Sequence, residues 1–155
     1  MGNNEIYYHN APRYWIRAMT FVPYFWNEKE GEKISSHVKT FKVSTEVDAT
    51  VIVTVLNSNL FSCRFLLLSN CRDLSSRENK NFPLGIDKMN DIIKKELIGT
   101  CKQLMEDYKD HSVRKEAKYL SGKVVYDEFY PRHSKLIINK IDEILEIIMF
   151  LAKRN

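Results

Sequence analysis

The chain has 155 residues, enough for one domain that buries roughly two thirds of its unfolded surface, so we expect a single domain over residues 1–155. Its 44% hydrophobic and 28% charged residues are globular proportions, which exclude an intrinsically disordered chain. The 24 basic and 20 acidic residues give a net charge of +4, which permits nucleic-acid binding without indicating it.

Several absences bound the location of the chain. The longest uncharged apolar runs, Val51–Val55 and Leu66–Leu68, are far shorter than the roughly 20 residues of a membrane-spanning helix. The first residues lack the order of a secretory signal. The three cysteines, Cys63, Cys71 and Cys101, form no CxxC pair, so neither a disulfide framework nor a zinc site is expected. We predict a cytoplasmic chain without membrane contact, with Cys63 in the core.

Aromatic and β-branched residues dominate the N-terminal part and predict two short strands, Glu5–His9 and Tyr14–Val22, separated at Pro12. A polar loop over Asn27–Ser36 and an alternating third strand over His37–Val43 follow. We expect the aromatic residues to pack a sheet face on helices. The alternative places some of them beside DNA, namely Tyr7, Tyr8, Tyr14, Trp15 or Trp26.

Local signals conflict in the middle of the chain. Ala49–Val55 favours a strand by propensity, but a helix cap at Ser44 or Thr45 precedes it, with acids in the first turn. The cap and the length of the segment favour a helix. A second helix is predicted from about Ser58 to Leu68.

The C-terminal half reads mainly as helix. Ile86 to about Asp110 is amphipathic, Lys123–Tyr130 predicts a strand, and Ser134 caps a closing helix over residues 134–152. The apolar stripe of that last helix is expected to be core; the alternative is a partner-binding face. These elements predict an α+β fold, with a small mixed or antiparallel sheet of short strands packed with helices and long C-terminal helices.

Catalytic signatures are missing from the sequence. The five glycines form no phosphate-binding motif, and the four histidines have no metal-ligand spacing. The adjacent carboxylates Asp127–Glu128 and Asp142–Glu143 point in different directions from a strand or a helix, so neither makes a ready acid–base pair. We therefore expect no enzyme activity from this chain by itself.

The stretch from Leu56 to Pro83 holds the main functional signal. Two polar clusters, Asn57–Asn59 and Ser69–Asp73, bracket the apolar run Leu60–Leu68, and the stretch ends at Asn81–Pro83. Amide, hydroxyl and guanidinium groups are the side-chain groups that read base edges or bind phosphates. The stretch is therefore the first candidate for a nucleic-acid contact.

Leu56-Asn57-Ser58-Asn59-Leu60-Phe61 resembles the "LLNS-x-LF" signature of the target-recognition domains of TaqI-like adenine DNA methyltransferases and type IIG restriction-modification enzymes. The resemblance continues in order along nearly the whole chain. Tyr7-Tyr8 and Tyr14–Arg17 resemble the opening strands of that family, and Ser35–Lys39 resembles its serine-rich segment. Ser69–Leu74 resembles its "Arg-His-Leu" turn, with Asp73 in place of histidine. Asn81–Pro83 resembles its "NFP" end, and Ser134–Leu145 its closing helix.

The resemblance implies a TaqI-like specificity domain that binds double-stranded DNA and gives sequence specificity without catalysis. The family's glycine motif for cofactor binding and its Asn-Pro-Pro-Tyr loop do not occur here. S-adenosylmethionine is therefore expected in a partner methyltransferase domain or subunit, which would flip the target adenine into its own pocket. The alternatives are a helical protein-interaction or dimerisation module and, third, a small nuclease.

The resemblance also suggests which side chains contact DNA. Arg72 and Arg77 would pair with guanine or phosphate, Asn57, Asn59 and Asn70 would read adenine, and the lysines would hold phosphates. The expected DNA-contacting residues are Arg17, Lys39, Lys42, Asn70, Arg72, Arg77 and Lys80. Structural alternatives remain open: Asn57 and Ser58 cap or join helices, and Arg72 forms a salt bridge with Asp73 or a nearby acid.

Overall fold

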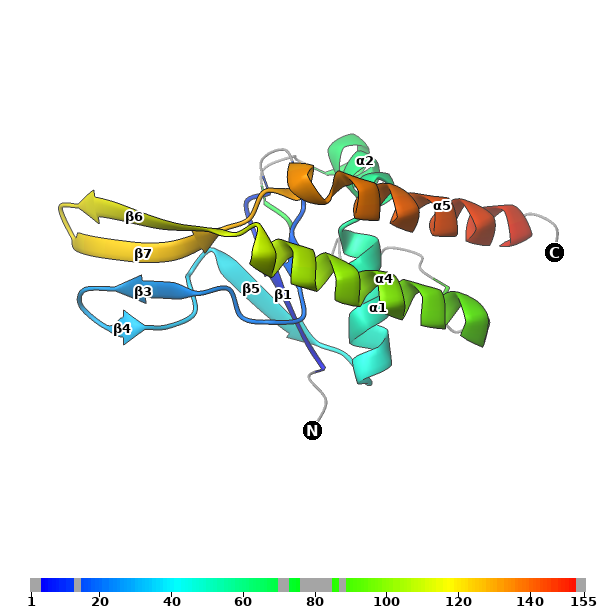
Figure 1. The fold of residues 1–155 in the computed structure, drawn as a ribbon, viewed down its shortest axis with the longest axis horizontal. Helices are drawn as coiled ribbons and strands as arrows, with labels where there is room; N and C mark the ends of the chain where they lie inside the picture. Colours follow the sequence, from blue (N-terminus) through cyan, green and yellow to red (C-terminus); the bar gives the residue numbers. More distant parts are fainter. Residues whose placement is uncertain (1–3, 13–14, 70–72, 76–84, 87–88, 153–155) are drawn as a thin grey trace.

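The computed structural model describes residues 4–12, 15–69, 73–75, 85–86 and 89–152 (Figure 1). Within these ranges the fold is α+β, as predicted, with two antiparallel sheets and four α-helices. One sheet has three strands in the order β2-β1-β5, and the other has four in the order β4-β3-β7-β6. The four-stranded sheet projects from the helical body at the end where α4 leads into β6, opposite the C-terminal end of α5 (Figure 1).

The three-stranded sheet contains β1 (Glu5–His9), β2 (Ala18–Met19) and β5 (Val38–Lys42). The predictions of β1 and β5 are confirmed to within one residue. The predicted strand Tyr14–Val22 is too long, because among the described residues only Ala18 and Met19 have strand structure. Ala18 directs its backbone N–H and C=O to the side chain of Asn57, so no further strand adds on that side.

The four-stranded sheet contains β3 (Phe25–Asn27), β4 (Gly31–Glu32), β6 (Val113–Tyr119) and β7 (Gly122–Glu128). The polar loop predicted over Asn27–Ser36 is wrong at its start, because Asn27 and Gly31 pair across a tight turn. Gly31 adopts a φ of 76°, a left-handed conformation that favours glycine. The strand β7 matches its prediction, whereas the edge strand β6 is not predicted by its charged, exposed sequence.

The helix α1 (Glu46–Leu56) resolves the conflict between cap and propensity. The Thr45 hydroxyl oxygen accepts a hydrogen bond from the Asp48 N–H at 3.0 Å, which confirms the predicted cap. Apolar β-branched residues surround the helix axis, and Val51, Val53 and Val55 are fully buried. A helix that is apolar on all sides is stable where it is enclosed by protein, so burial overrides the strand propensity.

The other helices are α2 (Asn59–Leu68), α4 (Asp91–Asp110) and α5 (Lys135–Ala152). The predicted start of α4 at Ile86 is five residues too early, because the Asn90 side chain caps the helix and accepts from the Ile93 N–H at 2.8 Å. A 3-10 turn, Pro131–Ser134, leads into α5. Ser134 precedes α5 as predicted, but its hydroxyl donates to the carboxylate of Asp107 in α4.

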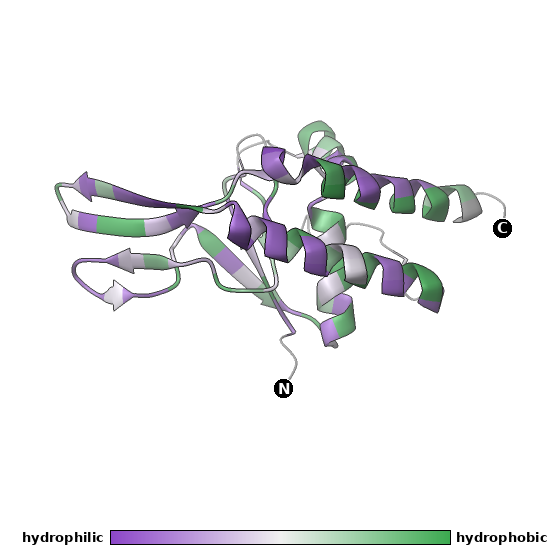
Figure 2. Cartoon of the chain, viewed as in Figure 1, coloured by the Kyte–Doolittle hydropathy of each residue, from purple (hydrophilic) through white to green (hydrophobic). Residues whose placement is uncertain are grey.

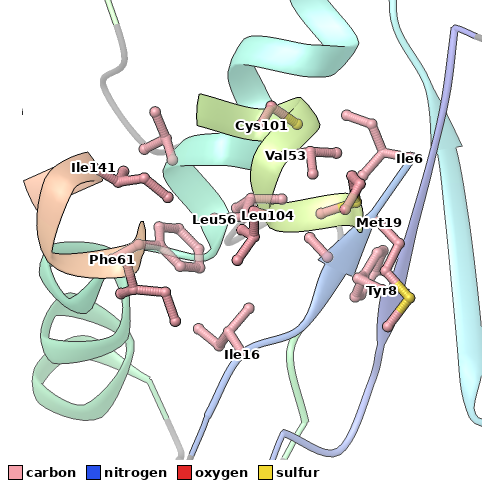
Figure 3. Close-up of a cluster of buried hydrophobic side chains, with 14 of the residues drawn as sticks. Ile6, Tyr8, Ile16, Met19, Val53, Leu56, Phe61, Cys101, Leu104 and Ile141 are labelled. Carbon is pink, nitrogen blue, oxygen red and sulfur yellow. The ribbon is translucent and has the colours of Figure 1, made fainter. Parts of the chain in front are cut away.

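The main core lies between the three-stranded sheet and α1, α4 and α5, with α2 closing one end (Figures 1 and 3). Side chains from every one of these elements meet there, among them Ile6, Tyr8, Met19, Val53, Leu56, Phe61, Leu104 and Ile141. Cys101 belongs to this core. Cys63 does not, contrary to the prediction, because Phe61 and Phe65 define the buried face of α2 and Cys63 lies on the opposite, exposed side.

In the part of the chain that the structure describes, no single helix is long and apolar enough to span a membrane. The pair α1 and α2 reaches that length and composition only together, and its axis bends by 70°. Figure 2 shows hydrophobic residues continuing to the end of α2, where Leu67 and Leu68 are 82% and 72% exposed. The predicted apolar run is therefore core at its start and surface at its end.

Candidate nucleic-acid interface

Asn57 lies at the junction of α1 and α2 and is only 3% exposed. Its side-chain oxygen accepts from the Ala18 N–H at 3.2 Å and the Tyr108 hydroxyl at 2.8 Å. Its amide nitrogen donates to the carbonyl oxygens of Ala18 and Val53, both at 2.8 Å. The amide thus replaces a neighbouring strand for Ala18, and the expectation that Asn57 reads adenine is wrong because the side chain is buried and engaged.

Ser58 and Asn59 complete the junction. The Ser58 hydroxyl oxygen caps α2 by accepting from the Phe61 N–H at 3.0 Å, so the interpretation that Asn57 and Ser58 join helices is confirmed. The Asn59 amide donates to Asp142 Oδ2 at 2.6 Å, and the Leu60 N–H donates to Oδ1 at 3.3 Å. These bonds tie α2 to α5. They engage the Asn59 amide and the Asp142 carboxylate in structural contacts.

The second pair of adjacent carboxylates, Asp127 and Glu128, has cationic partners. Asp127 pairs with Arg114 at 2.5 Å and Glu128 with Lys115 at 2.7 Å, across the β6–β7 ladder. Lys115 holds the pKa of Glu128 below its usual value through a hydrogen bond. Among the described residues, no group of three His, Cys, Asp or Glu side chains is placed to hold a metal ion.

The expected DNA-contacting residues fall into two groups. Asn70, Arg72, Arg77 and Lys80 lie outside the described residues, as does the proposed Arg72–Asp73 salt bridge. The described ones do not share a face. Lys39 and Lys42 are three positions apart on β5 and so point to opposite faces, and Lys42 lies 3.5 Å from Glu5. Arg17 donates from Nη1 to the Phe129 carbonyl at 3.3 Å and lines a pocket together with His9 and His37.

The positive charge of the chain is unevenly distributed. Seven of its 24 basic residues and two of its 20 acidic residues lie outside the described ranges, so the described part has 17 basic and 18 acidic side chains. The β6–β7 hairpin carries four basic residues, Arg114, Lys115, Lys118 and Lys123, and three of them pair with acids: Arg114 with Asp127, Lys115 with Glu128 and Lys123 with Glu116. The net charge of +4 therefore comes from the remaining residues, to which Arg72, Arg77, Lys80 and Glu78 contribute +2 and Arg13, Lys153 and Arg154 contribute +3.

The connection between α2 and α4 is fixed to the core at described points. Leu74 is 1% exposed and belongs to the main core, and its N–H donates to the Asn10 carbonyl at 2.6 Å. Met89 is buried near the start of α4, in a smaller cluster with Val51 and Leu97. The turn predicted to touch DNA is thus attached at Leu74 to the end of β1.

The chain matches no family model, no curated protein and no solved structure. Function is therefore inferred from the residues and their placement.

A pocket of about 560 Å³ is lined by residues of both sheets and of the segments that adjoin them. His9, Arg17 and His37 line this pocket together because backbone hydrogen bonds join their segments. The His9 N–H donates to the Arg17 carbonyl at 3.2 Å, and the Asn10 N–H donates to the His37 carbonyl at 3.0 Å. Sequence reasoning treats these histidines as isolated, since 28 residues separate the two. Their approach follows only from strand pairing.

We predict that lowering the pH destabilises the protein, partly through His9. Burial and, to a smaller extent, the nearby Arg17 and His37 together lower the pKa of His9 to about 4. Between pH 6.5 and 4 the unfolded state binds a proton that the folded state does not, so this contribution is complete above pH 6.5 and is lost as the pH falls toward 4. Urea unfolding at pH 7 and at pH 4.5 measures how much unfolding free energy is lost between the two. His9→Gln should make that loss smaller by about 1 to 3 kcal/mol. An equal loss in both proteins would contradict the assignment.

Proposed function

We propose that this chain is the DNA-binding target-recognition domain of a type II, IIG-like restriction-modification adenine methyltransferase. It gives sequence specificity and performs no catalysis by itself. The observation that carries the proposal is a group of basic side chains within the segment that resembles the family's contact turn. That segment, from Ser69 to Pro83, contains the basic residues Arg72, Arg77 and Lys80 and the acidic residues Asp73 and Glu78.

The scaffold supports this role because it holds the first part of the segment. The buried junction at Asn57 fixes the direction of α2, which leads into the segment, and Leu74 anchors the segment to the core. In the proposed complex, Arg72 and Arg77 pair with guanine or phosphate, Asn70 reads a base edge, and Lys80 neutralises a phosphate. S-adenosylmethionine and the catalytic groups belong to the partner methyltransferase domain or subunit, in the cytoplasm.

Duplex binding at several salt concentrations tests the proposal. Neutralising phosphates releases counterions, so affinity should fall with a log–log slope of about −0.9 for each phosphate contacted. Fluorescence anisotropy of a labelled random-sequence duplex between 50 and 200 mM salt measures that slope. A protein that shows no duplex binding even at the lowest salt, or binding that does not change with salt, would refute the proposal.

A protein-interaction module is a second candidate, favoured by the apolar side chains on the surface of α2 and α5. Leu67 and Leu68 on α2 and Leu136, Ile147 and Phe150 on α5 are all more than half exposed. Exposed apolar patches often mark a partner surface. In the proposed enzyme this surface would face the methyltransferase domain. If it instead pairs two copies of this chain, light scattering should show a dimer at high concentration; a monomer throughout would exclude self-association.

A further inference from the structure

The pocket between the two sheets combines two chemically different walls. One wall belongs to the end of the three-stranded sheet and carries polar groups: His9, Arg17, His37 and the hydroxyls of Ser35 and Ser36. The other wall belongs to the four-stranded sheet and is largely aromatic. Its volume of about 560 Å³ lies within the range of small-molecule sites, roughly 300–1,000 Å³.

The aromatic wall is a platform built by strand pairing. Phe25 of β3 and Tyr126 of β7 are directly opposite each other in the antiparallel ladder, so their side chains project from the same face of the sheet, and both line the pocket. Val124 follows on the same face of β7, two residues from Tyr126, and Tyr119 closes the far end of the pocket. In the described part of the structure, neither Phe25 nor Tyr126 has a ring–ring contact. Adjacent aromatic rings on a sheet face are a stacking surface for unpaired bases.

The polar wall carries the cation Arg17, and the acids that line the pocket already pair with other cations. The Arg17 guanidinium is fixed by its bond to the Phe129 carbonyl. His9 ends β1, and His37 lies in the turn just before β5. Both acids that line the pocket are occupied, Asp127 by Arg114 and Glu128 by Lys115. A negatively charged group beside Arg17 would therefore meet hydroxyl and guanidinium donors and carboxylates that are already neutralised.

We propose that this pocket binds a single unstacked nucleotide, with the base on Phe25 and Tyr126 and the phosphate beside Arg17 and the serine hydroxyls. The site is separate from the positively charged segment assigned to duplex DNA, so it does not depend on that assignment. The two are nonetheless neighbours, because Leu74 of the segment bonds to Asn10 and the next residue, Ala11, lines the pocket. A base flipped out of a bound DNA strand would therefore have a binding pocket nearby.

Calorimetric titration of the protein with adenosine 5′-monophosphate, adenosine and inorganic phosphate tests the inference. The mononucleotide should bind more tightly than either part. Phe25→Leu and Tyr126→Leu should each weaken it on the order of tenfold, the usual effect of removing a stacking ring. Trp26→Leu is the matched control, because Trp26 pairs with Val125 on the other face of the same sheet and should leave binding unchanged.

Three results would overturn the inference. One is the absence of mononucleotide binding at millimolar concentration by protein whose circular dichroism shows it to be folded. Another is equal weakening by Trp26→Leu and Tyr126→Leu, which would indicate a general loss of structure. The third is binding of phosphate as tight as the mononucleotide and unaffected by the ring substitutions, which would indicate an anion site only. Loss of duplex binding in Arg72 and Arg77 variants leaves all three readouts unchanged, so the two proposals fail separately.

Discussion

Asn57→Ala should be among the most destabilising single substitutions in this chain, lowering the free energy of unfolding by about 3 to 5 kcal/mol. The truncation leaves three buried groups without their partner: the N–H and C=O of Ala18 and the hydroxyl of Tyr108. Burial raises the pKa of Tyr108, so its hydroxyl stays protonated and needs an acceptor. Each buried group left unsatisfied costs about 1 to 3 kcal/mol. Urea unfolding monitored by circular dichroism measures the loss.

Asn59→Ala is the matched control, two residues away. Its amide bonds to one carboxylate, Asp142, at a partly exposed position where water can replace it. We expect a loss of about 1 kcal/mol or less. Similar losses for the two variants would show that the Asn57 amide does not hold α1, β2 and α4 together.

Leu74→Ala should destabilise the protein by about 2 to 5 kcal/mol, the usual cost of removing a buried leucine side chain. Leu74 is 1% exposed and lies in the main core, in the connection between α2 and α4. The same variant should also weaken duplex binding under conditions where it remains folded, because it loosens the proposed contact segment. Denaturant unfolding and anisotropy on the same samples measure both effects.

Leu67→Ala controls for the loss of a leucine as such. Leu67 is 82% exposed at the end of α2, so the substitution should change stability by no more than about 0.5 kcal/mol. A Leu74→Ala protein as stable as Leu67→Ala would mean that the segment is not anchored in the core. Normal stability and reduced binding together would also exclude the anchoring role.

Local signals in the sequence predict the parts of this fold that depend on neighbouring residues. The caps at Thr45 and Ser58 bond within three residues, so α1 and α2 are recognisable before any tertiary contact is known. The strands β1 and β5 are found to within one residue, β1 from its aromatic and β-branched residues and β5 from the alternation in its sequence. The role of Asn57 as a helix junction also follows from its position between two helical patterns.

Other features depend on contacts between distant residues and leave no local signal. The edge strand β6 has no apolar face, because both of its faces are largely exposed and its partner β7 supplies the register. The pocket joins His9 with Glu128, which are far apart in sequence and meet only through the two sheets. The exposure of Cys63 follows from which face of α2 packs on α5, and the apolar run alone does not specify that face.

The most direct test of duplex recognition compares two charge variants of the full chain. Arg72→Gln/Arg77→Gln removes two cations from the proposed contact segment, and Lys29→Gln/Lys33→Gln removes two from the turn and strand end at β3–β4. The slope of log affinity against log salt for a duplex should become less steep by about two in the first variant and stay unchanged in the second. Equal slopes for both variants and the wild-type protein would contradict the proposed contact segment.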